Sequence, residues 1–158
     1  MIASFAGKVV LVAGGTGGLG RAVTLSFLKQ EASVVTTYRT QEEFAALKNA
    51  AGAAAPLLDG RRVDVTDDAA VGRLVDGILA EHGRLDVLVN TVGGYAGGVK
   101  LWSLDTEVFD RMLALNLRAG YALARAAMAP MLRQKQGAIV NVAAKAAFDH
   151  APGAAAYA

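Results

Sequence analysis

VVLVAGGTGGLG, residues 9–20, is an apolar run that passes directly into a glycine-rich loop. A strand, a glycine loop and a helix in this order hold the pyrophosphate of a dinucleotide, because glycines let the backbone approach the phosphates and the helix N-terminus presents unpaired N–H groups. The spacing is Gly-x-x-x-Gly-x-Gly, which is not the commoner Gly-x-Gly-x-x-Gly. We therefore predict a dinucleotide-binding loop made by Gly14, Thr16, Gly17, Gly18, Leu19 and Gly20.

Strand and helix signals alternate along the rest of the chain, which is typical of a parallel α/β sheet. Strands are predicted near Lys8–Ala13, Ser33–Tyr38, Arg61–Val65, Leu85–Asn90 and Ala138–Val142. Helices are predicted at Gly18–Gln30, from Thr40 into the alanines before Pro56, at Asp67–Glu81, and at Asp105–Gln134 as two helices or one bent helix. Residues 143–158 are expected to form a loop and the first turn of another helix.

Composition excludes several classes of protein. A chain of 158 residues can bury a sizeable core, and 54% hydrophobic with only 19% charged residues argues against disorder. The net charge of +2 is too small to favour nucleic acid or an anionic membrane as partner. No cysteine, no long apolar run and no signal-peptide pattern are present, which fits a cytoplasmic protein. His82 and His150 lack metal-ligand spacing, so no metal site is expected.

The end of the second predicted strand bears on the choice of nucleotide. An acidic residue there would accept a hydrogen bond from the ribose 2′-OH of NAD, but Tyr38 and Arg39 occupy the place. A guanidinium can bind a 2′-phosphate through two parallel hydrogen bonds. NADP(H) is therefore favoured and NAD(H) remains possible, the alternative being that Arg39 is a solvated loop charge.

Polar residues at the ends of the next two predicted strands are further candidates. Asp64 can meet the adenine amino group while Val65 packs against the ring, although a single acid at a strand end is also common in turns. Asn90 can join its strand to a neighbouring strand or face the cofactor ribose, since ligands bind at the carboxyl ends of such strands. Val92 and Gly93 follow in a glycine-rich loop that would let the nicotinamide ribose approach the backbone.

Two other candidates carry little signal of their own. Asn116 lies in the apolar run Leu113–Leu117, where an amide is either buried with partners or functional, and the residues alone favour the structural role. Tyr157 has an acidic phenol, but most single tyrosines are packing residues.

Taken together, these residues resemble the short-chain dehydrogenase/reductase family over essentially the whole chain. The three glycines and Asp64 fit family motifs, and residues 90–93 fit its Asn-Asn-Ala-Gly motif with Thr and Val in the middle positions. The resemblance implies a Rossmann-type doubly wound parallel sheet in three α/β/α layers, with strand order 3-2-1-4-5. It also implies hydride transfer between a nicotinamide and a carbonyl, imine or quinonoid substrate. Tyr157 would be the proton donor, and Asn116 would hold a water in a proton relay.

The chain departs from the family in two places. The family serine lies thirteen residues before the tyrosine, where this chain has Ala144, and the family lysine would fall beyond Ala158. The segment Gly93–Gly98 is similar to the dihydropteridine reductase branch, which also lacks the serine. That similarity implies a pteridine-like or quinonoid substrate, bound in a site that Tyr95 and Ala144 would line.

The resemblance also suggests how the chain is organised. Residues 1–158 would form a single NAD(P)-binding domain that stops before the last strands and the substrate lid, and the full-length protein would be a homodimer or homotetramer acting on a small molecule. Because Ala144 and the absent lysine weaken the catalytic interpretation, a non-catalytic dinucleotide-binding or redox-sensing domain is the alternative function.

Overall fold

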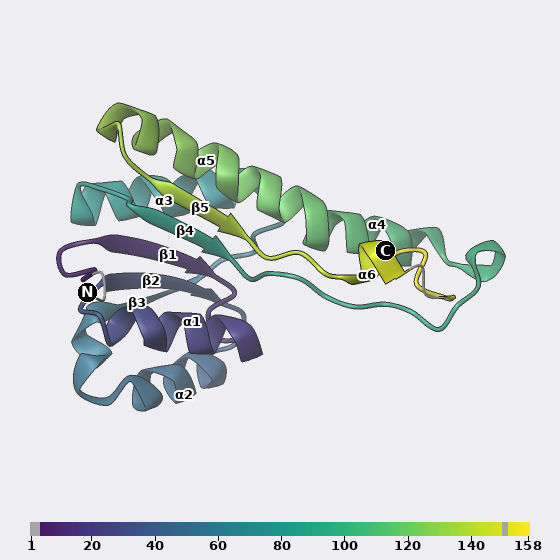
Figure 1. The fold of residues 1–158 in the computed structure, drawn as a ribbon, viewed down its shortest axis with the longest axis horizontal. Coiled ribbons are helices and arrows are strands. Elements are labelled where there is room, and N and C mark those ends of the chain that lie inside the picture. The colour runs from purple at the N-terminus through teal and green to yellow at the C-terminus, as the bar shows by residue number, and fades with distance from the viewer. Residues whose placement is uncertain (1–3, 150–151) are drawn as a thin grey trace.

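The computed structural model describes residues 4–149 and 152–158. Its sheet has five parallel strands in the order β3-β2-β1-β4-β5 (Figure 1). The strands are β1 (Val9–Ala13), β2 (Ser33–Tyr38), β3 (Leu58–Arg62), β4 (Val87–Asn90) and β5 (Ala138–Asn141). This order confirms the doubly wound sheet that the sequence predicts, with the reversal of strand order between β1 and β4.

Helices cover both faces of the sheet because β1 is apolar on both sides. Val10 and Val12 face a cluster shared with α1 (Gly18–Leu28) and α2 (Gln41–Ala51). The alternate residues Val9 and Leu11 face the other cluster, shared with α3 (Asp68–His82) and α5 (Ala119–Gln134). Figure 1 shows these two helical layers on opposite sides of the strands. A fully apolar strand between two helical layers is the pattern expected of a central parallel strand.

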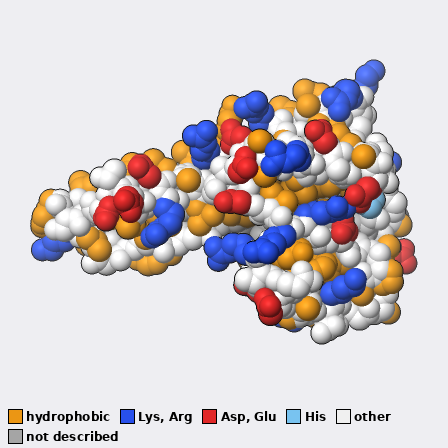
Figure 2. Space-filling model, turned by 180° about the vertical axis from the view of Figure 1, so that it is seen from behind, with side chains coloured by type: hydrophobic (Ala, Val, Ile, Leu, Met, Phe, Trp, Pro, Cys, Tyr) orange, Lys and Arg blue, Asp and Glu red, His pale blue; other side chains and the backbone are white. Residues whose placement is uncertain are grey.

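An arm projects from the carboxyl end of the sheet. It contains the loop after β4, a short 3₁₀ turn (Leu101–Ser103), α4 (Thr106–Leu113) and the short helix α6 (Ala146–Asp149) (Figure 1). Figure 2 shows the arm from behind, where acidic and basic side chains are mixed over its surface. The N–H of Gly98 donates to the carbonyl of Gly153 at 2.9 Å, so the loop after β4 is held against the C-terminal segment.

The third strand lies earlier than predicted. β3 covers Leu58–Arg62 and pairs with Val34–Tyr38 of β2, whereas the sequence suggested Arg61–Val65. Only Leu58 of the five residues is buried, so this edge strand lacks the apolar pattern that identifies strands. The apolar Val63 and Val65 suggested a strand at their own position. In the structure they pack against the core from the connection that follows β3.

Other boundaries differ by smaller amounts. β4 begins at Val87, two residues later than predicted, because the buried Leu85 precedes the ladder. α2 ends at Ala51 and is followed by a 3₁₀ helix (Gly52–Leu57) that contains Pro56. The expected bend in the helical region after Asp105 is a π-helical turn (Ala114–Arg118) between α4 and α5. Within the described residues, no helix is long and apolar enough to cross a membrane. His150 lies outside the described residues.

Candidate functional site

The glycine loop between β1 and α1 is shaped by close backbone contacts. Gly14 has a φ of +78°, a conformation that favours glycine. A Cβ on Gly20 would collide with the carbonyl oxygen of Gly14 and lie 2.7 Å from Oγ1 of Thr91, so α1 starts directly against the loop. A Cβ on Gly18, in contrast, would meet no protein atom within 4 Å. The loop therefore packs tightly on its inner side and is open at the start of α1.

Neighbouring strands hold this loop from both sides. The N–H of Gly14 donates to Oγ1 of Thr37 in β2 at 2.9 Å. The hydroxyl of Thr91, just after β4, donates to the carbonyl of Ala13 at 2.8 Å. Neither threonine was identified from the sequence, although both stand at the carboxyl ends of strands that flank β1. These bonds fix the loop at the point where the strand order reverses, which is where open α/β sheets bind ligands.

No side chain caps the N-terminus of α1. Gly17 is the N-cap residue, no side chain caps it, and the first turn of this helix contains no acidic residue. Gly17, Gly18 and Leu19 are exposed. Unpaired N–H groups and the positive end of a helix dipole favour an anion there. The space beyond Gly18 and the uncapped helix therefore fit the pyrophosphate of a dinucleotide.

The end of β2 is held by α2. The ring of Tyr38 stacks on that of Phe44, with 4.8 Å between ring centroids and 12° between planes. The Tyr38 hydroxyl donates to Oε1 of Gln41 at 2.9 Å. Arg39 is exposed next to this stacked pair. The structure thus places Tyr38 and Arg39 at the carboxyl edge of the sheet, near the glycine loop that Thr37 ties to the same strand.

Asp64 lies in a turn after β3, not in the strand as predicted. Its Oδ1 accepts hydrogen bonds from the hydroxyl of Thr66 at 2.7 Å and from the N–H of Thr66 at 2.9 Å. These two bonds hold the pKa of Asp64 below its ordinary value. Val65 is buried in the core. Asp64 therefore has the local turn role that its sequence also allowed, and contact with adenine stays a prediction.

Asn90 joins two strands. Its Nδ2 donates to Oδ1 of Asn141 in β5 at 3.2 Å, and its Oδ1 accepts from the N–H of Val92 at 3.1 Å. The side chain is buried, and a Cβ on Gly120 of α5 would lie 2.9 Å from its Nδ2. Of the two roles expected for Asn90, the structure shows the link to a neighbouring strand. Direct contact with the cofactor ribose stays a prediction.

Asn116 fastens the loop after β4. Its Oδ1 accepts from the N–H of Gly94 at 2.9 Å, and its Nδ2 donates to the carbonyl of Gly94 at 3.0 Å. The side chain belongs to the π-helical turn, and a Cβ on Gly93 would lie 3.0 Å from its Oδ1. This is a positioning role consistent with the structural interpretation of the sequence. The proton-relay role for Asn116 stays a prediction.

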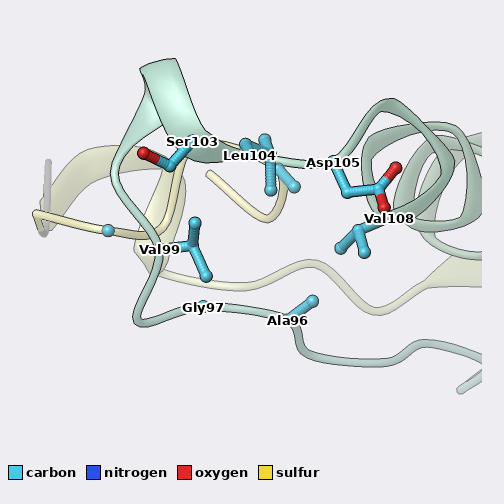
Figure 3. A pocket seen from close by; sticks show the side chains of 9 residues that line it. Ala96, Gly97, Val99, Ser103, Leu104, Asp105 and Val108 are labelled. Carbon is cyan, nitrogen blue, oxygen red and sulfur yellow. The ribbon is translucent and has the colours of Figure 1, made fainter.

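Tyr157 is brought to the same loop. Its half-buried ring meets that of Tyr95 edge to face, with 5.0 Å between centroids and 80° between planes. A small cavity of about 130 Å³ is lined by their chain neighbours Ala96 and Ala156, and the side chains of Val99, Leu104 and Val108 point into it (Figure 3). Ala144 is half-buried just before α6. Phenol groups and apolar surface therefore gather within the arm (Figure 1).

The fold agrees with the comparison to known families. The model for short chain dehydrogenase matches residues 8–158. The chain belongs to the short-chain dehydrogenase/reductase family. The fungal short chain dehydrogenase/reductase dpmpG of Macrophomina phaseolina is 35% identical over 147 residues, which cover 91% of this chain and 84% of dpmpG.

Solved structures of the family share the fold closely. ElxO with NADP bound has a TM-score of 0.89 and 31% identity, covering 95% of this chain and 60% of that protein. NAD⁺-bound xylitol dehydrogenase has a TM-score of 0.91 and 26% identity, covering 98% of this chain and 60% of that one. Members of similar fold thus bind NADP or NAD⁺. The chain spans 54% of the length of two other curated relatives, about half.

Proposed function

We propose that this protein is an NAD(P)(H)-dependent oxidoreductase that reduces or oxidises a small carbonyl, imine or quinonoid substrate. The observation that carries the proposal is the glycine loop, fixed between Thr37 and Thr91 and open at the uncapped start of α1. Membership of the short-chain dehydrogenase/reductase family supports it. A bound nicotinamide would supply or accept the hydride.

The chain's own residues would manage the proton and the position of the substrate. The Tyr157 phenol would donate a proton to the substrate oxygen or nitrogen that becomes negative during reduction. Tyr95 packs against that phenol edge to face and would orient it. Asn116 would keep the loop after β4 in place through its two bonds to Gly94.

Ala144 narrows the class of substrate. An alanine cannot donate a hydrogen bond to the substrate oxygen, and loss of one such donor typically costs about 10²–10³ in rate. An electron-poor acceptor such as a quinonoid pteridine tolerates this loss because it accepts hydride readily. The exposed ring of Tyr95 offers a flat apolar surface beside the proton donor, which suits a planar acceptor.

NADP(H) is the preferred nucleotide in this proposal. Arg39 is exposed beside Tyr38 at the end of β2, where a guanidinium can bind a 2′-phosphate. Arg39→Asp is expected to weaken NADP⁺ binding by about 10-fold or more while changing NAD⁺ binding little, as measured by titration calorimetry. Equal losses for the two nucleotides would show that Arg39 does not contact the 2′-phosphate.

The catalytic part of the proposal is tested by Tyr157→Phe in the full-length protein. The variant keeps the ring that packs on Tyr95 but loses the proton donor, so turnover of NADPH with a quinonoid, imine or carbonyl acceptor should fall by about 10²–10⁴. Nucleotide binding should be unchanged. A variant that turns over at the wild-type rate would remove Tyr157 from the mechanism.

A second candidate function is a non-catalytic dinucleotide-binding or redox-sensing domain. The alanine at position 144 favours it, because this position then offers no hydroxyl to polarise a carbonyl. This function predicts nucleotide binding without consumption of NADPH on any acceptor of the three classes. Robust consumption by the full-length protein would exclude it.

A further inference from the structure

One hydrogen bond links the glycine loop to α2. The hydroxyl of Thr16 donates to Oε2 of Glu43 at 3.3 Å. Thr16 belongs to the loop that follows β1, and Glu43 belongs to the first turn of α2, which follows β2. The bond therefore places a carboxylate between the end of β2 and the loop. Glu43 follows the end of β2, where an acid that binds the ribose of NAD is expected in this fold.

The position of Glu43 is fixed by its neighbours. Its own N–H donates to Oγ1 of Thr40, the N-cap residue of α2, at 3.4 Å. The next residue, Phe44, stacks on Tyr38 at the end of β2. Phe44 also packs against β3, so closely that a Cβ on Gly60 would collide with its ring. The first turn of α2 is thus packed against two strands, which places the exposed Glu43 side chain within reach of Thr16.

The adenosine ribose of a nucleotide bound on the glycine loop lies between that loop and the end of the second strand. Arg39, at the end of β2, and Glu43, bonded to Thr16 of the loop, would therefore be the side chains that meet its 2′ position. A 2′-hydroxyl can donate to a carboxylate, whereas a 2′-phosphate of about −1.5 to −2 charge is repelled by it and competes for the Thr16 hydroxyl. The two side chains consequently favour different nucleotides.

We infer that Glu43 determines nucleotide specificity by opposing Arg39, so that the preference for NADP(H) is weaker than Arg39 alone would give. The inference rests on the proposed nucleotide-binding function. It assigns to Glu43 the acceptor role for a 2′-hydroxyl and to Thr16 the role of holding that carboxylate beside the loop. The protein would accordingly bind both nucleotides, with a modest preference.

The experiment compares Glu43→Gln with Glu42→Gln by calorimetric titration of NADP⁺ and NAD⁺ into the chain. Glu42 is a matched control, because it is exposed, carries the same charge and lies about 100° away around the helix. Glu43→Gln keeps an acceptor for Thr16 but removes the charge. Its NADP⁺ affinity should rise roughly three- to tenfold, and the rise should shrink in about 1 M salt. NAD⁺ affinity should change by less than about twofold or fall.

Three results would overturn the inference. If Glu43→Gln leaves the NADP⁺ to NAD⁺ affinity ratio at the wild-type value, the carboxylate does not reach the 2′ position. If Glu42→Gln raises that ratio as much as Glu43→Gln does, the effect is general charge removal. If none of the three proteins binds either nucleotide while all unfold at the same urea concentration, the proposed nucleotide-binding function fails and takes the inference with it.

Discussion

Replacement of Gly20 by alanine tests how the glycine loop is built. The added Cβ would collide with the Gly14 carbonyl oxygen and lie 2.7 Å from Oγ1 of Thr91, and the first of these partners is backbone that cannot rotate away. Overpacking of this kind typically costs about 1–3 kcal/mol, and alanine recovers at most about 1 kcal/mol of that through helix propensity. The free energy of unfolding should therefore fall by about 1–2 kcal/mol.

Gly18→Ala is the matched control, since it adds the same methyl group two residues earlier. That methyl group would meet no protein atom within 4 Å, so stability should be unchanged or rise by up to about 1 kcal/mol. The methyl group would instead occupy the space assigned to the pyrophosphate. Nucleotide affinity should drop by about 10-fold or more in Gly18→Ala, through loss of close backbone approach.

The assays are urea unfolding followed by circular dichroism without ligand, and calorimetric titration of NADP⁺ into each folded variant. In thermal unfolding, a loss of 1 kcal/mol in the free energy of unfolding should appear as a fall of roughly 2–4 °C in Tm for a chain of this size. The two variants should behave in opposite ways. Gly20→Ala should be less stable than the wild type, whereas Gly18→Ala should be as stable as the wild type but bind NADP⁺ poorly. Equal destabilisation of both variants, or wild-type affinity in Gly18→Ala, would refute this expectation.

Two further predictions concern Asp86, a buried carboxylate just before β4, and Asn116 in the π-helical turn. Burial favours the neutral form of Asp86, but hydrogen bonds from Arg84 and from the Val9 N–H outweigh it and hold the Asp86 pKa below its ordinary value. Asp86→Asn should therefore lower the free energy of unfolding by about 1–2 kcal/mol at pH 7. Urea titrations should show that the difference in stability between wild type and variant closes below about pH 4, as the wild-type carboxyl protonates. A stability difference that stays constant down to about pH 2 would contradict this role of Asp86. Asn116→Leu should raise the hydrogen-exchange rate of the Gly94 amide by about 10-fold, whereas Asn116→Asp keeps an acceptor and most of the protection. Equal exchange in both variants would show that the loop is held by other contacts.

The central part of the fold could be predicted from local sequence because it is apolar on both faces. Val9–Ala13 is buried throughout, so continuous hydrophobicity identified β1 and the glycine spacing identified the turn into α1. β3 could not be placed in this way. Its residues Asp59–Arg62 are polar or glycine, and β2 rather than their own side chains selects them as a strand.

In the candidate site, too, residues with local contacts could be predicted and residues with distant partners could not. The glycines are recognisable because their spacing follows from contacts within one turn of chain. The partners of Asn116 and Glu43 are 22 and 27 residues away in sequence, and such pairings arise only when strands and helices are packed together. Thr37 and Thr91 were missed for the same reason, since a threonine at a strand end has many possible uses.

The π-helical turn at Ala114–Arg118 determines what a deletion in this region would change. One residue more than an α-helical turn needs is accommodated there, as in the single π-helical turns found inside α-helices, frequently at functional sites. Removing one residue from this turn would restore a regular α-helix and leave the side chains of α4 and α5 facing as they do now, because the wide turn already absorbs the extra residue. The residues of the turn itself would shift, and Asn116 would lose its two bonds to Gly94. The extra residue thus serves the loop after β4 and not the packing of the two helices, so its deletion should loosen that loop while α5 keeps its contacts with the sheet.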